Sequence, residues 1–347
     1  MKIALITDTH YNFKKANKNF HDFFEKFYTN IFFPTLERDN VKTVIHLGDA
    51  FDNRKGIDYW ALWWAKKYVY DKYKELGITV YSIVGNHDTY YKNSNKVNSI
   101  DSLLDEYDNV IKVSSPKEFN IDGLDIALLP WINVDNQEET FNLIKSTKAK
   151  VAFGHLELQG FTIFPGQTME HGMDKDIFKN FDRVFSGHYH TRSNDGRVFY
   201  VGNPYQMFWN DWNDVRGFNY FDTDTYELTH VENPYTIFEK VYYDDTDIST
   251  LNVDKYNDKI VKLIVRKKSN QREYDKFLDK LTTASMIELK ISEILDINDN
   301  EFCESDIEIE DTITTLERYI EESEFDLNKS IAKKIMRDIY AEALEVE

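Results

Sequence analysis

The feature that most constrains this chain is a series of short apolar segments that stop at polar, metal-capable side chains. Five segments that read as strands end in this way: at Asp8-Thr9-His10, Gly48-Asp49, Gly85-Asn86-His87-Asp88, Gly154-His155 and Gly187-His188-Tyr189-His190. In open α/β sheets, sites form at the carboxyl ends of the strands, and glycine there lets the backbone turn sharply and approach a ligand closely. We therefore expect these side chains to meet in one site.

The order of elements predicts an α/β fold. Strands are expected at residues 2–7, 41–47, 78–84, 124–129, 150–153, 182–186 and 197–201. Aromatic side chains at helical spacing predict helices over 16–38 and 58–76, between the first three strands. Strands that alternate with helices indicate a layered α/β architecture, and the closer spacing of the later strands predicts more sheet in the second half.

The composition changes after about residue 236. Segments 260–266 and 286–294 read as strands around a helix at 271–281, and helices are expected at 312–322 and 327–344. We predict four segments: a large domain over 1–235, a small α+β domain over 236–295, an acidic linker over 296–311 and a helical arm over 312–347.

The number of cysteines and the hydropathy of the chain indicate the cellular compartment in which the protein is expected. Cys303 is the only cysteine, so no disulfide can form within the chain, which fits a reducing cytoplasm. The apolar run before Asp8 is too short for a signal peptide, and no run of about 18 apolar residues predicts a membrane span. We expect a cytoplasmic protein that does not bind a membrane.

The net charge is −19, which argues against nucleic-acid binding because phosphate contacts depend on Lys and Arg. Residues 301–347, however, carry 15 acidic and 5 basic residues, so this tail accounts for −10 and the first 300 residues for −9. Metal sites also need carboxylates, whose charge the cation offsets. The bulk charge therefore weakens a DNA-binding hypothesis without removing it.

The chemistry of the strand ends indicates a metal site. Carboxylates, one amide and several imidazoles suit manganese, iron or zinc better than calcium or magnesium, which favour all-oxygen sites. Seven candidate ligands stand in the chain: Asp8, His10, Asp49, Asn86, His155, His188 and His190. Seven ligands with one bridging would give two metals four ligands each, the usual clamp for phosphoryl chemistry. Because residues two apart in a strand face the same way, we expect His188 and His190 to reach one cavity.

Other residues have more than one interpretation. We expect structural roles for His21, His46 and His230, whereas His171 lies in a loop and either faces substrate or solvent. The crowded tryptophans Trp60, Trp63 and Trp64 predict either a homodimer interface or core packing.

As an ordered set, the motifs D-x-H, GD, GNHD, GH and GHxH resemble the calcineurin-like metallophosphoesterase superfamily over about residues 1–205. GDAFDNRK (48–55), GNHDTYY (85–91) and VGNPYQM (201–207) are similar to the SbcD-type nuclease subunits of double-strand-break repair complexes. The chain looks most like the recombination endonuclease subunit of large tailed bacteriophages, which would place it in the host cytoplasm. The resemblance implies a sandwich of two mixed sheets flanked by helices, with a small α+β capping domain and C-terminal helices.

The resemblance also implies roles for the site residues. Positions matching Asp8, His10 and His190 hold one metal; those matching Asn86, His155 and His188 hold the second; and Asp49 bridges the two. His87 matches a catalytic histidine that binds no metal and assists the leaving oxygen. This sequence departs from eukaryotic and archaeal relatives at Asp52, where they carry a histidine, which puts a transition-state contact from that position in doubt.

By resemblance, the protein is a manganese-dependent nuclease that hydrolyses DNA phosphodiesters by a two-metal mechanism, as a 3′-to-5′ exonuclease and single-strand endonuclease. Magnesium, iron or zinc are alternatives to manganese. The implied partners are DNA, a second copy of the nuclease domain and a coiled-coil ATPase of the structural-maintenance type bound through 312–347, in DNA end processing, repair and recombination. Phosphomonoesterase and cyclic-nucleotide phosphodiesterase activities remain alternatives, since both use the same constellation.

Contact with DNA would come from basic and aromatic side chains on loops that follow the strand ends. The candidates are Arg54, Lys55, Tyr90, Tyr91, Lys92 and Arg192, and the alternative for each is a solvated loop residue.

Overall fold

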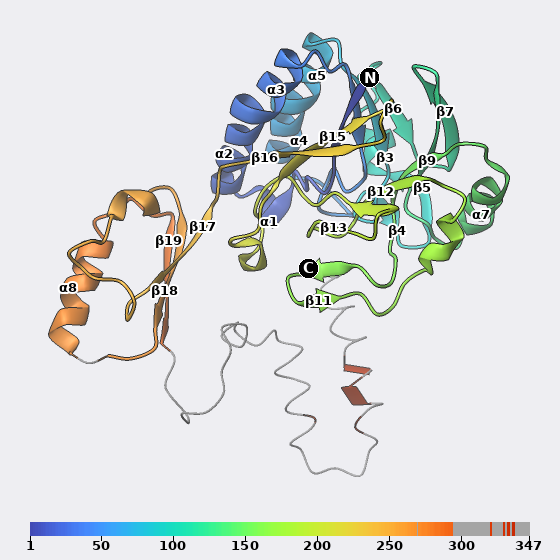
Figure 1. The fold of residues 1–347 in the computed structure, drawn as a ribbon. Coiled ribbons are helices and arrows are strands. Elements are labelled where there is room, and N and C mark those ends of the chain that lie inside the picture. The colour runs from blue at the N-terminus through green and yellow to red at the C-terminus, as the bar shows by residue number, and fades with distance from the viewer. Residues whose placement is uncertain (269, 294–319, 321–328, 330–331, 334, 337–347) are drawn as a thin grey trace. The chain divides into compact units, whose positions relative to one another are not determined.

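The computed structural model describes residues 1–268, 270–293, 320, 329, 332–333 and 335–336 (Figure 1). Met1–Glu293 forms one compact unit, to which the description below refers. The expected acidic linker over 296–311, Cys303 and most of the helical arm over 312–347 lie outside the described residues.

The first large sheet has six strands in the order β16-β15-β1-β2-β3-β6. Its strands are β1 (Lys2–Ile6), β2 (Thr43–His46), β3 (Thr79–Ile83), β6 (Val110–Val113), β15 (Gly217–Asp222) and β16 (Leu228–Glu232). The neighbours β1, β2, β3 and β6 are parallel, whereas β15 is antiparallel to both β1 and β16. The sheet is therefore mixed, as predicted.

The second large sheet also has six strands, in the order β13-β14-β12-β9-β8-β7. Its strands are β7 (Lys117–Ile121), β8 (Leu124–Leu129), β9 (Val151–His155), β12 (Arg183–Gly187), β13 (Ser193–Asn194) and β14 (Val198–Tyr200). Strands β8, β9, β12 and β14 run parallel, and the edge strands β7 and β13 are antiparallel to their neighbours.

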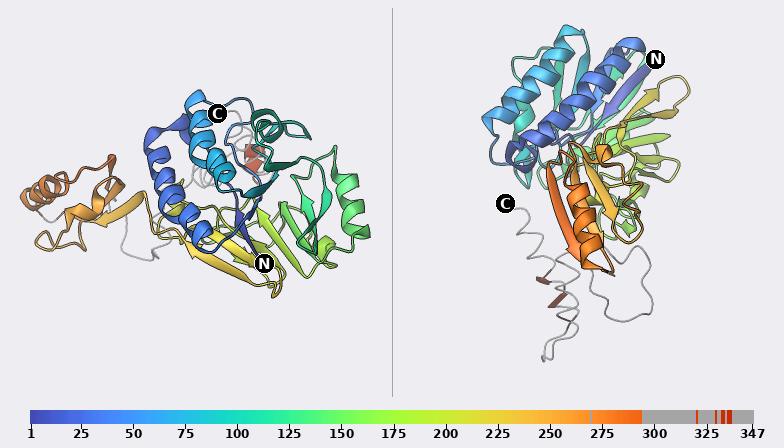
Figure 2. Two further views of the ribbon diagram at one scale, coloured as in Figure 1. Left: turned by 90° about the horizontal axis from the view of Figure 1, so that it is seen from above. Right: turned by 90° about the vertical axis from the view of Figure 1, so that its left-hand side faces the viewer.

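Helical segments cover the outer faces of the two sheets (Figures 1 and 2). They are α1 (Phe13–Ala16), α2 (Lys18–Phe27), α3 (Phe33–Arg38), α4 (Tyr59–Ala65), α5 (Asp71–Glu75), α6 (Ser99–Leu103) and α7 (Gln137–Ser146). One π-helical segment joins α2 to α3 (Tyr28–Phe32) and another joins α4 to α5 (Lys66–Tyr70). The helices predicted over 16–38 and 58–76 are thus present, but apolar periodicity does not reveal the π segments inside them.

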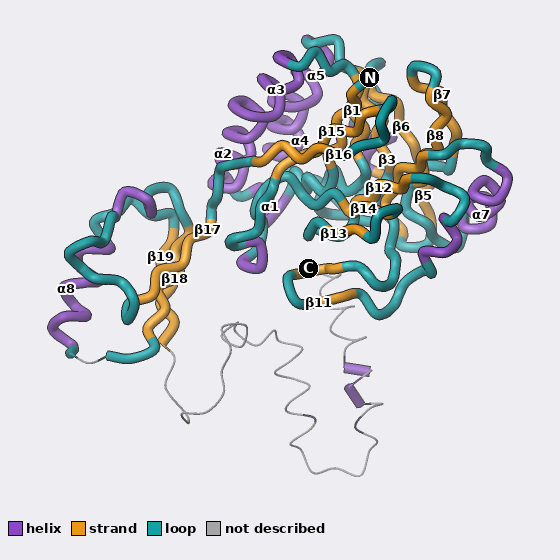
Figure 3. The backbone as a smooth tube through the Cα atoms, viewed as in Figure 1, coloured by secondary structure: helices purple, strands orange, loops and turns teal. Residues whose placement is uncertain are grey.

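Alternation of side chains along each strand produces the layers. On β1, Ala4 and Ile6 pack against the aromatic side chains of α2–α5, while Ile3 and Leu5 face the other way. Ile3 and Leu5 join Leu128 and other side chains of the second sheet in a core between the two sheets. The outer face of the second sheet packs against α7, which lies apart from α2–α5 (Figure 3). The predicted two-sheet sandwich flanked by helices is confirmed.

The three crowded tryptophans divide between the two interpretations. Trp64 is buried in the core between α2 and the sheet. Trp60 and Trp63, on the same helix, are 39% and 45% exposed, and their rings lie 5.0 Å apart. Core packing therefore explains one of the three side chains and leaves an aromatic pair on the surface of α4.

A small α+β unit follows residue 236. Strands β17 (Phe238–Tyr242), β18 (Ile260–Val265) and β19 (Glu288–Glu293) form a parallel sheet, with α8 (Gln271–Leu281) packed on one face. The side-chain carbonyl of Gln206 accepts hydrogen bonds from the backbone N–H groups of Ile237 (3.0 Å) and Phe238 (3.1 Å), at the start of this unit. The α+β character is as predicted, and the boundary at 236 stays a prediction.

Two short hairpins and three 3₁₀ segments complete the described elements. They are β4 (Thr89–Tyr91) with β5 (Ser94–Asn98), β10 (Thr162–Phe164) with β11 (Gln167–Thr168), and the 3₁₀ segments Lys175–Phe178, Trp209–Asp211 and Val253–Tyr256. Within the described part of the chain, no helix has both the length and the apolar character needed to cross a membrane.

Candidate metal centre

The carboxyl ends of β1, β2, β3, β9 and β12 bring the expected side chains together. Three groups of carboxylates and imidazoles each offer ligand atoms that lie within 4.8 Å of one another. The groups are Asp8, His10 and His190; Asp49, His155 and His188; and His10, Asp52 and His87. The first two correspond to the two predicted metal sites except for Asn86, and the third was not predicted.

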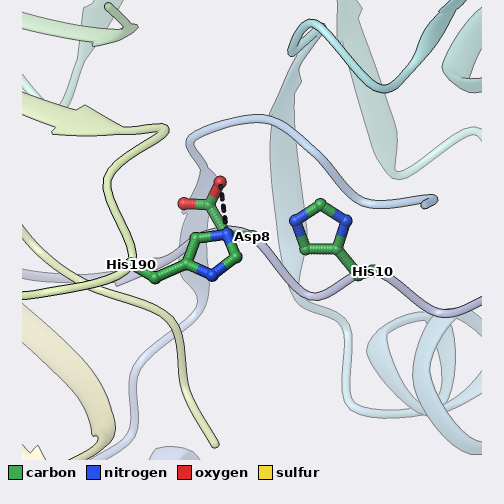
Figure 4. Close-up of side chains that lie close together, drawn as sticks. All are labelled: Asp8, His10 and His190. Carbon is green, nitrogen blue, oxygen red and sulfur yellow. Dashed lines mark ion pairs between the residues drawn. The ribbon is translucent and has the colours of Figure 1, made fainter. Parts of the chain in front are cut away.

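In the first group, the side chains of Asp8 and His190 converge from β1 and from the loop after β12 (Figure 4). Nε2 of His190 lies 3.9 Å from the Asp8 carboxylate, and the rings of His10 and His190 are 5.3 Å apart. The buried Asp8 carboxylate accepts hydrogen bonds from the hydroxyl of Thr7 (2.7 Å) and the backbone N–H of His188 (3.0 Å). These bonds fix the carboxylate in place.

In the second group, two imidazoles surround one amide oxygen. Oδ1 of Asn86 lies 2.9 Å from Nε2 of His155 and 3.0 Å from Nδ1 of His188. Nδ1 of His155 is 2.8 Å from the backbone oxygen of Leu47, to which it donates. In the neutral imidazole, the Nε2 lone pair would then face the oxygens of Asn86 and Asp49, which is unfavourable unless a proton or a cation lies between them. The donor set therefore suits a metal ion.

Asp49 lies between the two groups. One carboxylate oxygen is 3.3 Å from Nε2 of His155 and 3.9 Å from Nε2 of His10, while the other accepts a hydrogen bond from the backbone N–H of His87 (2.8 Å). A single carboxylate within reach of both groups has the position that a bridging ligand requires. Its role as a bridge remains a prediction.

His10 is buried with one unsatisfied nitrogen. Nδ1 forms an ion pair with the Asp52 carboxylate at 3.0 Å, whereas Nε2, 3.9 Å from the Asp49 carboxylate, has no hydrogen-bond partner among the described residues. Buried polar groups are rarely left unpaired, and a metal ion would satisfy this imidazole. Asp52 is placed to orient the ring, as carboxylates commonly do for metal-bound histidines. Asp52, which replaces the histidine of the eukaryotic and archaeal relatives, is thus placed to position His10, a role that sequence reasoning did not predict.

Burial and neighbouring charges shift the protonation of the centre. Burial lowers the pKa of His10, but Asp52, Asp49 and Asp8 together outweigh it and raise that pKa to about 9. Burial likewise lowers the pKa of His155, but Asp49 and Asp8 raise it to about 9. Burial lowers the pKa of His188 to about 3. The buried carboxylates therefore favour nearby positive charge that His188 does not supply, and a divalent cation would supply it.

The backbone at the site is unusual. Asp8, His10, Asp49 and His188 have φ values of 50°, 43°, 54° and 87°, in the left-handed region that favours glycine. Backbone strain of this kind clusters at functional sites. The extended geometry from which we expected His188 and His190 to reach one cavity is absent, because β12 ends at Gly187 and His188 turns the chain, but both side chains lie in the groups of the centre. The turn sends the two imidazoles to different groups.

Two motif glycines permit the close packing of the centre. A Cβ on Gly85 would lie 2.2 Å from the Asp49 carboxylate and 2.3 Å from its backbone nitrogen. Gly48 has φ of 104°, and its Cβ would lie 2.4 Å from Nδ1 of His155. Neither position has room for a side chain while the site keeps its geometry.

His87, the predicted catalytic residue, is half-buried at the edge of the centre. Its Nδ1 is 2.7 Å from the backbone oxygen of Asp52, to which it donates, and its ring lies 4.9 Å from that of His10. This bond leaves Nε2 as the nitrogen available for proton transfer. Since His87 also belongs to the third group with His10 and Asp52, geometry alone does not exclude it as a ligand.

The predicted DNA-contact residues differ in exposure, and the expectation that all of them lie on loops is wrong for Tyr90 and Tyr91, which belong to a short strand. Arg54 is half-buried, and the exposed residues are Lys55, Tyr90, Tyr91, Lys92 and Arg192. Tyr90 and Tyr91 belong to β4, and their rings lie 4.8 Å apart. Their contact with DNA remains a prediction.

The other histidines lie outside the three groups. His46 is buried, 3.0 Å from the Thr9 hydroxyl, and its burial lowers its pKa to about 3. Nε2 of His21 lies 2.7 Å from the Tyr11 oxygen, and Nδ1 of His230 lies 3.1 Å from Asn219. These contacts agree with the structural roles expected for the three. His171 is exposed in its loop, and its interpretation stays open.

Sequence reasoning missed two residues that support the centre. The buried Asp88 carboxylate accepts hydrogen bonds from the backbone N–H groups of Gly85 (2.9 Å) and Phe51 (3.1 Å), which ties the ends of β2 and β3 together. The buried Arg216 donates to the backbone oxygen of His190 and to Asp211 (2.9 Å). The Asp of GNHD was visible as a motif residue, whereas no local pattern marks Arg216.

With this geometry in view, comparison with known proteins defines the class. The model of the calcineurin-like phosphoesterase family matches residues 1–192, and the chain belongs to this family. It is therefore an enzyme of a metal-dependent phosphoesterase class, as the motifs predicted.

A particular relative narrows the comparison. The chain is 32% identical over 290 residues to Exonuclease subunit 1 of Enterobacteria phage T4, an alignment covering 82% of each chain. The predicted resemblance to a phage nuclease subunit is confirmed. A solved structure described as that of a novel archaeal phosphodiesterase matches 67% of this chain and 100% of its own at 17% identity, and its TM-score of 0.36 is too low to carry an argument.

Gly85→Ala tests the close packing of the centre. The added methyl would displace Asp49, so we expect at least the roughly 10–100-fold loss of metal affinity that disturbed ligand positioning causes. Metal titration followed by elemental analysis measures it. Gly56→Ala is the matched control, because no atom lies within 4 Å of the Cβ position there. Equal metal affinity in both variants would contradict the packing argument.

Proposed function

We propose that this protein is a metal-dependent DNA nuclease that hydrolyses phosphodiester bonds. The observation that carries the proposal is the position of Asp49 within reach of two groups of imidazoles and carboxylates. The relative from phage T4 supports the choice of nuclease within the family, because its name is that of an exonuclease subunit. We further propose 3′-to-5′ exonuclease and single-strand endonuclease action in DNA end processing, repair and recombination.

The donor set favours two divalent cations, manganese first, with magnesium, iron and zinc as alternatives. We propose that Asp8, His10 and His190 hold one ion, that Asn86, His155 and His188 hold the other, and that Asp49 bridges them. Bound ions of this kind lower the pKa of a water molecule and stabilise the charge on phosphoryl oxygens.

The remaining chemistry belongs to the protein's own groups. His87 is fixed by its Nδ1–H bond to the Asp52 carbonyl, so in the imidazolium form its Nε2–H can donate a proton to the leaving oxygen, which leaves the neutral imidazole. The main-chain N–H of His87 donates to Asp49, which couples the position of the proposed acid to that of the proposed bridge. Arg54 and Lys55, on the loop that follows Asp49, supply positive charge for the DNA backbone.

A substrate panel tests the proposed function. We expect manganese-dependent release of labelled nucleotides from end-labelled DNA, with slower hydrolysis of a chromogenic phosphomonoester and of a cyclic nucleotide. The same panel without added metal is the control. Faster turnover of either small substrate than of DNA would favour the phosphomonoesterase or cyclic-nucleotide phosphodiesterase alternative.

His87→Ala separates proton transfer from metal binding. We expect DNA cleavage to fall by about 10²–10⁴-fold, the usual contribution of general acid–base catalysis, while bound metal stays at the wild-type level. Asp49→Ala is the contrast, since loss of a bridging carboxylate removes metal as well as activity. Loss of metal from His87→Ala would instead assign His87 to the ligands, in line with its place in the third group.

We also propose two protein partners. The exposed pair Trp60 and Trp63 supports a homodimer through the nuclease domain, because apolar aromatic side chains on a surface helix commonly mark interfaces. The segment 312–347, mostly outside the described residues, is proposed to bind a coiled-coil ATPase of the structural-maintenance type. The relative's designation as a subunit supports assembly with another chain.

Two variants test these partners in one light-scattering experiment. Trp63→Asp should be monomeric yet still bind the ATPase, whereas a chain lacking 312–347 should be dimeric yet fail to bind it. Each variant is the control for the other. A dimeric Trp63→Asp protein, or ATPase binding without 312–347, would contradict the corresponding proposal.

A further inference from the structure

A cavity of about 170 Å³ lies between the loop after β2 and the β4–β5–α6 segment. The loop contributes one wall, from Phe51 to Ile57, and the opposite wall comes from Tyr90, Val97 and residues 98–103. None of the seven candidate metal ligands lines it. The cavity is therefore separate from the metal centre, and neither the motifs nor the family match assigns it a role.

The cavity is joined to the metal centre through its loop. The backbone N–H of Phe51 donates to Asp88, and the next residue, Asp52, contacts both His10 (3.0 Å) and His87 (2.7 Å). Arg54, two residues further, lies close enough to Asp49 for their charges to interact. An occupant of the cavity would thus lie beside the residues that we propose to hold metal and to protonate the leaving group.

The side chains that line the cavity are mostly apolar, and Arg54 and Lys55 add positive charge on one wall. Phe51, Ile57, Val97 and Leu103 present apolar surface, and the Tyr90 ring, 42% exposed, adds an aromatic wall. Such a lining suits a flat aromatic ring, since apolar and aromatic contacts provide most of the affinity in small-ligand sites.

Three neutral polar side chains of the wall are already engaged. The Ser99 hydroxyl donates to Asp88 (3.0 Å), the Ser102 hydroxyl donates to the backbone oxygen of Asn98 (2.7 Å), and the Asn98 amide donates to Asp101 (2.7 Å). Arg54 differs: within the described residues, its buried Nη1 has no hydrogen-bond partner. A buried unpaired guanidinium nitrogen calls for an acceptor, and an anionic oxygen is the strongest one.

We propose that this cavity binds one unpaired nucleobase of the DNA strand next to the bond being cleaved, with Arg54 contacting the phosphate of the same nucleotide. The inference rests on the proposed nuclease function and names a subsite for it. A volume of about 170 Å³ suits one ring system, so in this proposal the base leaves its partner strand to enter the cavity. The subsite therefore favours single strands and frayed ends over intact duplex.

Abasic substitution tests the subsite directly. Single-stranded oligonucleotides with one abasic residue, placed in turn at each position near the cleaved bond, are compared with the intact strand. We expect roughly 10-fold or slower cleavage when the missing base is the one that fills the cavity, the scale of one lost base–aromatic stack. Equal cleavage at every abasic position would overturn the proposal.

A blocking variant locates the effect in the cavity. Val97 lines the cavity, is 48% exposed and lies on β5, so Val97→Trp can fill the space without disturbing the core. We expect this variant to cleave intact and abasic strands at nearly equal rates. Val134→Trp is the matched control, because Val134 is 77% exposed and does not line the cavity, and it should keep the wild-type preference. A wild-type preference in Val97→Trp would contradict the assignment.

Two further measurements keep the outcomes distinct. The melting temperature and the bound metal show whether the Val97→Trp variant is folded. If this variant is not folded, inhibition of the wild-type protein by deoxyadenosine monophosphate is compared with its inhibition by deoxyribose 5-phosphate. Stronger inhibition by the nucleotide supports the base subsite, and equal inhibition overturns it. If the wild-type protein hydrolyses a chromogenic phosphate ester but no DNA, the proposed nuclease function is wrong. If it cleaves DNA but cleaves intact and abasic strands at equal rates, only the proposed subsite is wrong.

Discussion

The structure depends on the mutual attraction and repulsion of buried charges at one edge of the sandwich. Asp8 and Asp49 are fully desolvated carboxylates, and desolvation of a carboxylate is costly unless opposite charge or hydrogen-bond donors compensate it. Imidazoles and backbone N–H groups provide part of the compensation. The buried Nε2 of His10, which has no hydrogen-bond partner among the described residues, shows that the protein groups alone do not complete it. The incomplete compensation of these buried carboxylates therefore supports a metal-binding role as much as the motifs at the strand ends do.

The rest of the fold keeps these charges close together. Parallel strands of both sheets end at the same edge, and the core between the sheets holds β1, β2, β9 and β12 in register. Asp88 ties the ends of β2 and β3, and Gly85 lets them approach. The left-handed backbone conformation at Asp8 and Asp49 costs free energy, which packing elsewhere in the fold must offset. Stability of the layers thus maintains an arrangement that would be unfavourable in a short peptide.

The acidic net charge and the proposed DNA substrate are compatible because charge acts locally. About half of the net charge of −19 comes from residues 301–347, away in sequence from the loops around the metal centre. At those loops, Arg54 and Lys55 stand five and six residues after the bridging candidate Asp49. The cavity beside Arg54 also suggests how an acidic protein could discriminate a nucleotide, by aromatic and apolar contact with a base more than by general attraction to phosphate.

The sequence by itself determined the chemistry and the class. Residue types at strand ends, such as Asp49 after Gly48, are local features, so the α/β layers and the candidate ligands could be predicted from them. Only the tertiary structure decided the left-handed turn at His188, the contact of Asp52 with His10, and the support of His190 by Arg216. These depend on backbone strain and on contacts between segments far apart in the chain, and neither leaves a periodic signal in the sequence.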